Sequence, residues 1–96
     1  MTEIQLSIFI QVAEQQSFTA AAQRLAISQS AVSHAFSVLE RELDVRLFRR
    51  MKAHVELTDV GARLLLRARE LRGIYEAIRQ EAADAKGLKS GTIIVI

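Results

Sequence analysis

The chain has 96 residues, of which 50% are hydrophobic and 25% are charged, and its formal net charge is +2. This length allows one small domain with an appendage, and the absence of cysteine excludes a disulfide framework and a thiolate metal site. Apolar runs such as those at 64–66 and 93–96 are too short for a membrane helix. Because the first residues also lack the basic start of a signal peptide, we expect a cytoplasmic protein without a membrane span.

The first 26 residues predict two helices. Residues 3–15 place four apolar side chains at the spacing of one buried helical face, namely Leu6, Phe9, Ile10 and Ala13. Ser17 or Thr19 can then cap a short second helix, at about 20–26, by accepting a hydrogen bond from its free amides. The buried residues of this second helix are mostly alanines, so another element can pack closely against it.

A third helix is predicted from Ser28, a typical N-cap residue, to about Leu43. Its inward face is apolar and carries Val32, Phe36, Leu39 and Leu43. Its opposite face is polar and free of acids over the first turns, and it carries Gln29, Ser30, Ser33, His34 and Ser37. Because the turn at 26–28 is so short, the second and third helices must cross at a steep angle.

A small β-hairpin is predicted at about 46–57. The segments "LFRR" and "HVEL" have strand-like composition and flank "MKA", although no glycine marks the turn. The run "RLFRRMK" at 46–52 carries four cations and no acid. A short basic run is by itself more often a solvated surface than a binding site, so its neighbours must decide between the two.

Thr58 and Asp59 predict the start of a long helix that Gly87 would end. Two rows of residues seven apart form a heptad ladder, namely Leu64, Leu71, Ile78 and Ala85 in one row and Gly61, Ala68, Tyr75 and Ala82 in the other. A helix of about 28 residues is roughly 40 Å long and projects beyond the core of the first 58 residues. It either folds back on its own domain or, as we predict, pairs with the same helix of a second chain, parallel or antiparallel, through Leu64, Ala68, Leu71, Tyr75, Ile78 and Ala82.

The last segment, 88–96, changes character. Glycine and serine precede the β-branched run "TIIVI", which has the composition of a strand but no partner strand in this chain. We therefore predict a domain at 1–58, with its helix-turn-helix at about 18–37, then a linker and dimerisation helix at 59–87. Residues 88–96 would be a hinge and the first strand of a truncated following domain.

Together these elements predict a mainly α fold, a winged helix-turn-helix with a β-hairpin wing and a long C-terminal helix. The polar face of the third helix suits the major groove of DNA, where Gln29 can pair with adenine and its neighbours Ser30, Ser33, His34 and Ser37 can reach bases or phosphates. The helix starts at Thr19 and Ser28 can offer backbone amides to a phosphate. Cations of the wing can contact the DNA backbone or the minor groove, and the candidates are Arg49, Arg50, Lys52 and His54.

Each of these residues alone is more often part of an ordinary solvated surface, but their combination indicates binding of double-stranded DNA. An enzyme is the main alternative, yet the chain has no nucleophile elbow, paired histidines or phosphate-binding glycine loop. We therefore expect no catalytic residue, no cofactor and no metal site. A winged helix used only for protein contacts is the second alternative, and a steep salt dependence of DNA binding would argue against it.

A longer pattern runs through the chain without gaps. In the first two helices it comprises Leu6, Phe9, Val12, Ala13, Glu14, Ser17, Phe18, Thr19, Ala21, Ala22 and Leu25. It continues with Ser28, Gln29, Ala31, Val32, Ser33, Leu39, Glu40, Leu43, "LF" at 47–48, Arg50, Leu57, Thr58 and Gly61. In this order and spacing the sequence resembles the LysR-type transcriptional regulators over essentially its whole length.

The resemblance implies a cytoplasmic bacterial regulator with a DNA-binding domain of about 58 residues and a linker helix that forms a homodimer. It also implies an operator with two half-sites, a tetramer in the full-length protein, and a C-terminal domain that senses a small-molecule effector. Nearly all of that effector-binding domain would be missing from this chain, apart from a first strand at 91–96.

Several positions depart from the usual pattern of these regulators. Ser30 stands where proline is common, Asp44 where glycine is frequent, and Lys52 with Ala53 where a glycine-arginine pair is frequent. Ala35 stands where a long polar residue is common, and its side chain cannot hydrogen-bond a base. Base readout would therefore depend on Gln29, Ser33 and His34.

Overall fold

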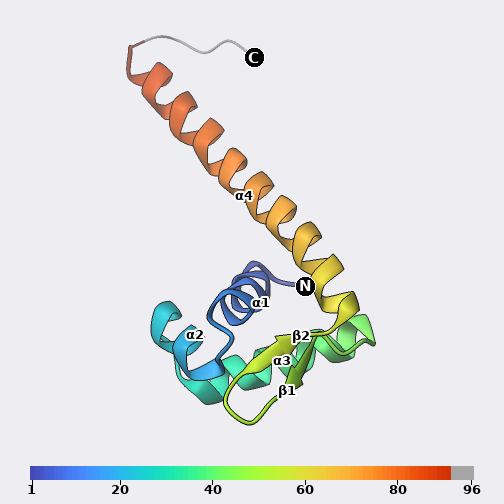
Figure 1. Cartoon of the computed structure of the whole chain (residues 1–96). Helices are drawn as coiled ribbons and strands as arrows, with labels where there is room; N and C mark the ends of the chain where they lie inside the picture. Colours follow the sequence, from blue (N-terminus) through green and yellow to red (C-terminus); the bar gives the residue numbers. More distant parts are fainter. Residues whose placement is uncertain (92–96) are drawn as a thin grey trace.

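Six elements follow one another in the order that the sequence predicts. The computed structural model describes residues 1–91, and its elements are α1 (Glu3–Gln15), α2 (Phe18–Leu25), α3 (Gln29–Leu43), β1 (Phe48–Arg50), β2 (Val55–Leu57) and α4 (Asp59–Gly91). In Figure 1, α1, α2, α3 and the hairpin form one body, and α4 leaves this body as a long rod. The mainly α winged helix-turn-helix fold is therefore confirmed.

Serine side chains determine where α2 and α3 begin. Ser17 Oγ accepts a hydrogen bond from the N–H of Ala20 at 3.1 Å, and Ser28 Oγ accepts one from the N–H of Ala31 at 3.1 Å. Each bond satisfies a backbone donor that the first turn of a helix otherwise leaves free. Because Ser17 is the cap, α2 begins at Phe18, two residues earlier than predicted.

Residues in the left-handed conformation end α1, α2 and α3. Gln16, Ala26 and Asp44 have φ angles of 55°, 58° and 56°. This conformation strains most side chains, but aspartate is among the residues that tolerate it. Asp44 can therefore end α3 in this conformation although it is not a glycine. At Ala26 the same conformation makes the turn so short that α3 begins three residues later and crosses α2.

The core is built around α1. The ring of Phe9 meets the rings of Phe36 and Phe48 edge to face, with centroids 6.4 and 5.9 Å apart. Ile8 and Val12, which lie off the predicted apolar stripe, are only 2% and 0% exposed. They are buried because α2, α3 and α4 all pack on α1, so that more than one side of this helix is covered.

The predicted hairpin is confirmed, and its turn closes without glycine. β1 and β2 are antiparallel, and the register places Phe48 opposite Leu57. The N–H of Met51 donates to the carbonyl of His54 at 2.8 Å and so closes the turn between the strands. Phe48 is 4% exposed, so this strand is attached to the core by its inward face.

α4 begins where the sequence predicts but ends later. Thr58 Oγ1 accepts a hydrogen bond from the N–H of Gly61 at 3.0 Å, as a capping hydroxyl does. Gly87 does not end the helix, which continues to Gly91. Glycine ends a helix by adopting a positive φ, and no glycine among the described residues does so. Of the predicted hinge and strand, residues 88–91 are helical, and residues 92–96 lie outside the described part of the chain.

The first turns of α4 pack on the body of the molecule. Leu65 and Ala68 are 8% and 5% exposed and belong to the core, and Tyr75 packs partly against it. Contact with α1 continues as far as Arg79, which pairs with Glu3, and beyond it the helix leaves the body (Figure 1). The first part of α4 therefore packs on its own domain, and the remainder of the helix extends away from it. Ala68 was predicted in the dimer seam, and in the single chain its side chain packs in the core of its own domain with 5% of its surface exposed.

Candidate nucleic-acid interface

The outer side of α3 presents the polar side chains that the sequence indicated. Gln29, Ser30, His34 and Ser37 are exposed, and Ser33 is half-buried. The helical period places Ser30, Ser37 and His34 opposite the buried Val32, whereas Ser33 lies on the flank of the helix. This flank faces the hairpin, because Ser33 lines the same groove as Phe48 of β1.

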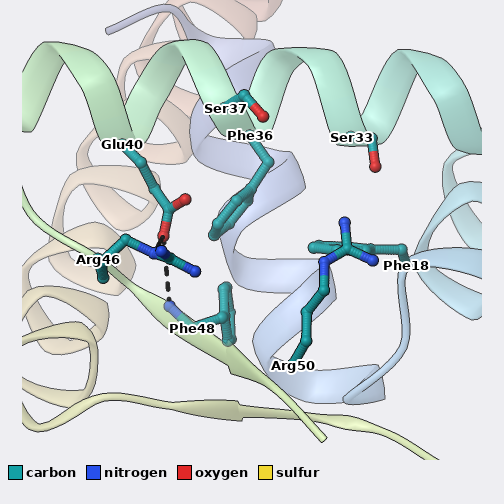
Figure 2. Close-up of a pocket in the computed structure, with 8 residues that line it drawn as sticks. All are labelled: Phe18, Ser33, Phe36, Ser37, Glu40, Arg46, Phe48 and Arg50. Atoms are coloured by element: carbon teal, nitrogen blue, oxygen red, sulfur yellow. Dashed lines mark hydrogen bonds and ion pairs between the residues drawn. The ribbon is translucent and has the colours of Figure 1, made fainter. Parts of the chain in front are cut away.

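Two adjoining grooves connect α3 with the wing. The helix–wing groove lies between α3 and β1 (Figure 2), and its lining residues are Phe18, Ser33, Phe36, Ser37, Glu40, Arg46, Phe48 and Arg50. The wing-tip groove lies between the turn of the hairpin and the starts of α2 and α3, and it is lined by Ser17, Phe18, Thr19, Gln29, Arg50, Met51, Lys52, Ala53, His54 and Val55.

The structure thus brings most of the predicted site residues onto one surface. We call it the reading surface, and it comprises Thr19, Gln29, Ser30, Ser33, His34, Ser37, Arg50, Lys52 and His54. Phe18 and Arg50 line both grooves and connect them. Side chains from the helix and the wing can therefore contact one ligand at the same time.

Arg50 is ordered by an aromatic ring. Its guanidinium carbon lies 4.7 Å from the centroid of the Phe18 ring, and Figure 2 shows its side chain reaching from β1 to this ring. A cation–π contact limits the motion of the side chain but does not neutralise its charge. The positive charge of Arg50 therefore remains available to a phosphate in either groove.

The hairpin separates two arginines that the sequence grouped together. Successive side chains of a strand point to opposite faces. Because Phe48 is buried against the core, Arg50 shares its face and Arg49 lies on the other one. There the register places Arg49 opposite Glu56. Of the two, Arg50 alone lines the helix–wing groove.

Two predicted site residues use their side chains within the chain. Ser28 Oγ caps α3 and also lies 3.2 Å from Ser30 Oγ. At the wing, Nε2 of His54 lies 3.2 Å from a carboxylate oxygen of Glu56. Ser28 therefore serves first as a helix cap, and what it offers a ligand is the start of α3 with its backbone amides.

Three charged residues near the reading surface were not among the predicted site residues. Arg41 is exposed and follows His34 by seven residues, which is two helical turns on the same side. Arg46 and Glu40 line the helix–wing groove and form an ion pair at 3.8 Å. The helical period could have identified Arg41 and the basic run at 46–52 could have identified Arg46, but the pairing with Glu40 needs the tertiary structure.

The middle of α4 carries an exposed apolar row formed by Leu71, Ile74 and Ile78. Their side chains are 37%, 57% and 58% exposed. Ile74 was missed because it lies off both heptad rows, although it follows Leu71 by three residues. Of the other residues predicted in the seam, Leu64 and Tyr75 are half-buried against the body and Ala82 is exposed.

Two classes of site are not found in the part of the chain that the structure describes. No three histidine or acidic side chains of residues 1–91 gather where they could hold a metal ion. Nor does any described helix combine the length and the apolar composition needed to cross a bilayer.

Comparison with known sequences gives a consistent result. The family model described as bacterial regulatory helix-turn-helix protein, lysR family, matches residues 4–62. The uncharacterized HTH-type transcriptional regulator YvbU of Bacillus subtilis is 50% identical over 94 residues, which are 97% of this chain and 32% of YvbU. An uncharacterized HTH-type transcriptional regulator of the ibpB-leuC intergenic region of Azotobacter vinelandii is 41% identical over 92% of this chain and 61% of its own length. This chain thus spans about one third to three fifths of these relatives.

Solved structures share the fold of the chain. The crystal structure of a CbnR_DBD–DNA complex aligns with a TM-score of 0.83 at 34% identity, over 90% of this chain and 99% of that one. The BenM_DBD/benA site 1 DNA complex aligns with a TM-score of 0.79 at 33% identity, over 95% and 99%. Both neighbours were therefore solved with DNA bound.

Proposed function

This chain belongs to the lysR family of bacterial regulatory helix-turn-helix proteins, and we propose that it binds double-stranded DNA as the DNA-binding domain of a transcription regulator. In this role it is a binding module and not an enzyme. Its ligand is an operator with two half-sites, one for each chain of a homodimer.

The observation that carries this proposal is the reading surface. A helix side that is polar and acid-free from Gln29 to Ser37 lies beside a basic wing, and two shared grooves join them. Polar side chains on an exposed helix can read base edges, and nearby cations can bind phosphates. The solved neighbours with DNA bound have the same fold.

We assign α3 to the major groove and the wing to the DNA backbone or the minor groove. Gln29, in the first turn of α3, is the best candidate for a bidentate contact with adenine. Ser30, Ser33, His34 and Ser37 would contact bases or phosphates beside it, and Thr19 and the start of α3 at Ser28 would bind phosphates. Arg50, Lys52 and His54 would bind the backbone from the wing, with Arg41 and Arg46 as added cations.

The apolar row of α4 is the proposed contact between two chains. Leu71, Ile74 and Ile78 present adjacent apolar side chains that stay 37%, 57% and 58% exposed in the single chain, although Leu71 also lines a cavity with Leu6, Phe9 and Leu43 of its own domain. Pairing with the same row of a second copy would bury them. Ala82 and the exposed side of Leu64 would extend the contact, and Tyr75 would border it.

Charge along α4 favours an antiparallel pair. Residues 59–74 carry four arginines against two acids, whereas residues 75–87 carry three acids against two cations. An antiparallel pair places the basic first half of one helix beside the acidic second half of the other. A parallel pair would place like charges together, which charge pairing along coiled coils disfavours.

The chain would act as part of a longer protein. It spans 32% of YvbU, and we propose that sensing of a small-molecule effector belongs to a further domain of the full-length protein. We retain the proposed division into a DNA-binding domain at 1–58 and a linker helix from residue 59, with the helix extended to Gly91. Because its target is chromosomal DNA, we place its action in the bacterial cytoplasm.

Titration with DNA at several salt concentrations tests this function. A duplex selected from a random pool with the 96-residue chain should bind far more tightly than unrelated duplexes. The logarithm of its affinity should fall with the logarithm of salt concentration by roughly 0.9 for each phosphate contacted. If no complex forms at low ionic strength with any pool, the proposed function is wrong.

A further inference from the structure

We propose that Glu40 is a positioning residue that holds the base of the wing against the recognition helix α3, so that both elements reach DNA together. This inference rests on the proposed DNA-binding function. It assigns to an acidic side chain, which would itself repel phosphates, a part in building a surface that binds them.

The carboxylate of Glu40 has three partners in the segment 46–48, which leads into β1. Its Oε2 accepts the N–H of Leu47 at 2.6 Å and the N–H of Phe48 at 3.4 Å, and Nε of Arg46 lies 3.8 Å away. Figure 2 shows this oxygen above the strand, with Arg46 and the backbone nitrogen of Phe48 beside it. The Glu40 side chain is 19% exposed, so water competes little for these bonds, and bonds to an ionised acceptor are the stronger kind.

Glu40 comes from the same flank of α3 that offers Ser33 to the helix–wing groove. The two residues are seven apart, which is two turns of one helix. A displacement of the wing from Glu40 would therefore change the width of the groove at Ser33. In this way the bond at one end of α3 determines how far the wing cations lie from the base-reading residues.

A second attachment holds the other end of β1. There Arg50 lies over the ring of Phe18, 4.7 Å from its centroid. At the start of the strand the ring of Phe48 also packs on Phe36, with centroids 4.8 Å apart. The ring contacts are apolar or weakly directional. The hydrogen bonds to Glu40 are directional, so they define the position of the strand along α3.

Removing the charge of Glu40 should change DNA affinity in opposite directions according to whether Glu40 positions the wing or only repels phosphates. Glu40 is the acidic residue that lines the helix–wing groove in the described part of the chain. By Coulomb's law alone, replacing its carboxylate with a neutral amide should strengthen DNA binding, because one negative charge near the phosphates is lost. If Glu40 positions the wing, the same replacement should weaken binding.

The experiment compares Glu40→Gln with the matched control Glu42→Gln in the 96-residue chain. Both changes remove one acid from α3, but Glu42 is exposed and pairs with the N-terminal amine of Met1, away from the wing. We expect Glu40→Gln to weaken binding to the selected duplex by roughly fivefold to tenfold. Glu42→Gln should bind as tightly as the wild type or more tightly.

A double-mutant cycle with Lys52→Ala then separates positioning from general destabilisation. In the wild type, Lys52→Ala should lower the slope of affinity against salt by about one. In the Glu40→Gln chain it should lower the slope by much less, because the displaced wing no longer contacts that phosphate. The loss caused by Gln29→Ala should be the same in both backgrounds.

Glu40→Asp keeps the charge but withdraws the carboxylate by one methylene, so it tests position alone and is expected to weaken binding as well. Thermal melting followed by circular dichroism shows whether each variant is folded under the conditions of the binding measurement.

If Glu40→Gln is unfolded, the affinity of the Glu40→Asp variant alone tests the inference. Wild-type affinity in both variants, or an undiminished effect of Lys52→Ala, would overturn the inference. If the wild-type chain does not bind DNA, the proposed function itself is wrong.

Discussion

Two glycines of α4 have opposite environments, and this difference predicts opposite effects of alanine. A Cβ on Gly61 would lie 2.2 Å from the carbonyl oxygen of Leu47, whereas a Cβ on Gly73 would meet nothing within 4 Å. Gly61→Ala should therefore destabilise the fold by about 1–3 kcal/mol through overpacking. Gly73→Ala should stabilise it by about 1 kcal/mol, because alanine is the better helix former.

Urea unfolding at one chain concentration measures both changes, so that coupling to dimerisation is held constant. Each variant serves as the control of the other, since both add one methyl group to the same helix. A Gly61→Ala chain as stable as the wild type would show that the wing base can move away from α4.

Gln29 is expected to contribute to specificity more than to general affinity. Gln29→Ala should cost about 1–3 kcal/mol on the selected duplex and little on random DNA, because the amide reads a base edge. Fluorescence anisotropy with both duplexes measures the difference. Equal losses on the two would mean that Gln29 contacts the phosphate backbone instead.

Arg49 and Arg50 form a matched pair of opposite placement. Each substitution to alanine removes one positive charge, but only Arg50 lines the grooves beside α3. Arg50→Ala should therefore reduce the slope of affinity against salt by about one, and Arg49→Ala should reduce it less. If both substitutions reduce the slope equally, Arg49 and Arg50 contribute equally to DNA binding and the proposed role of the Arg50 face is wrong.

Among the single residues, the sequence predicted types of contact better than directions. It selected Ser28 as a cap and the polar side of α3 correctly, because capping and helical period depend on residues within one or two turns. The sequence alone did not show that Arg49 and Arg50 lie on opposite faces of the hairpin. That distinction follows from which face of the hairpin packs on Phe36, a contact between distant parts of the chain.

At the scale of elements, α4 is the one whose role depends most on its surroundings. The heptad ladder read from the sequence lies on one side of the helix, but its own domain covers that side unevenly along its length. Ala68 is only 5% exposed against the body, whereas Leu71 and Ile78, farther along the same side, are 37% and 58% exposed. The exposed row then gains Ile74, which no heptad count included.

The apolar row predicts how α4 can be made monomeric. Leu71→Glu places a charge at the start of the row and should abolish the dimer while residues 1–58 stay folded, because burial of an unpaired charge is costly. The control is Leu66→Glu. Leu66 is 63% exposed and lies well away from the row around the helix, so its substitution should leave the dimer intact.

Sedimentation of both variants by analytical ultracentrifugation decides between these outcomes, and circular dichroism reports whether the helices persist. A dimer that survives Leu71→Glu would exclude the apolar row from the contact. A Leu66→Glu monomer would move the contact to another side of α4.

At the scale of the whole molecule, each chain carries one reading surface at the end of a projecting helix. The principal extents of the chain are 58 × 25 × 19 Å, and the projecting part of α4 accounts for the elongated shape in Figure 1. A pair of chains joined through α4 would hold two reading surfaces at a definite distance. Binding should therefore depend on the spacing of the half-sites and not only on their sequence.

Inserting five base pairs between the half-sites rotates one of them by about half a turn of DNA. We expect affinity for the 96-residue chain to fall roughly a hundredfold, because the second surface no longer reaches its site. The monomeric Leu71→Glu chain is the control and should bind both duplexes alike. If the wild type tolerates the insertion, the two reading surfaces are not rigidly connected.

Local sequence was sufficient for the order of the elements, for the starts of α3 and α4 and for the polar side of the recognition helix. These features depend on neighbours a few residues away, through hydrogen bonds to caps and through the helical period. Packing between elements settled the rest: the direction of Arg50, the burial of Ala68 and the bond from Glu40 to the wing. Each of these joins residues whose proximity arises only when separate helices and strands come together to exclude water from one core.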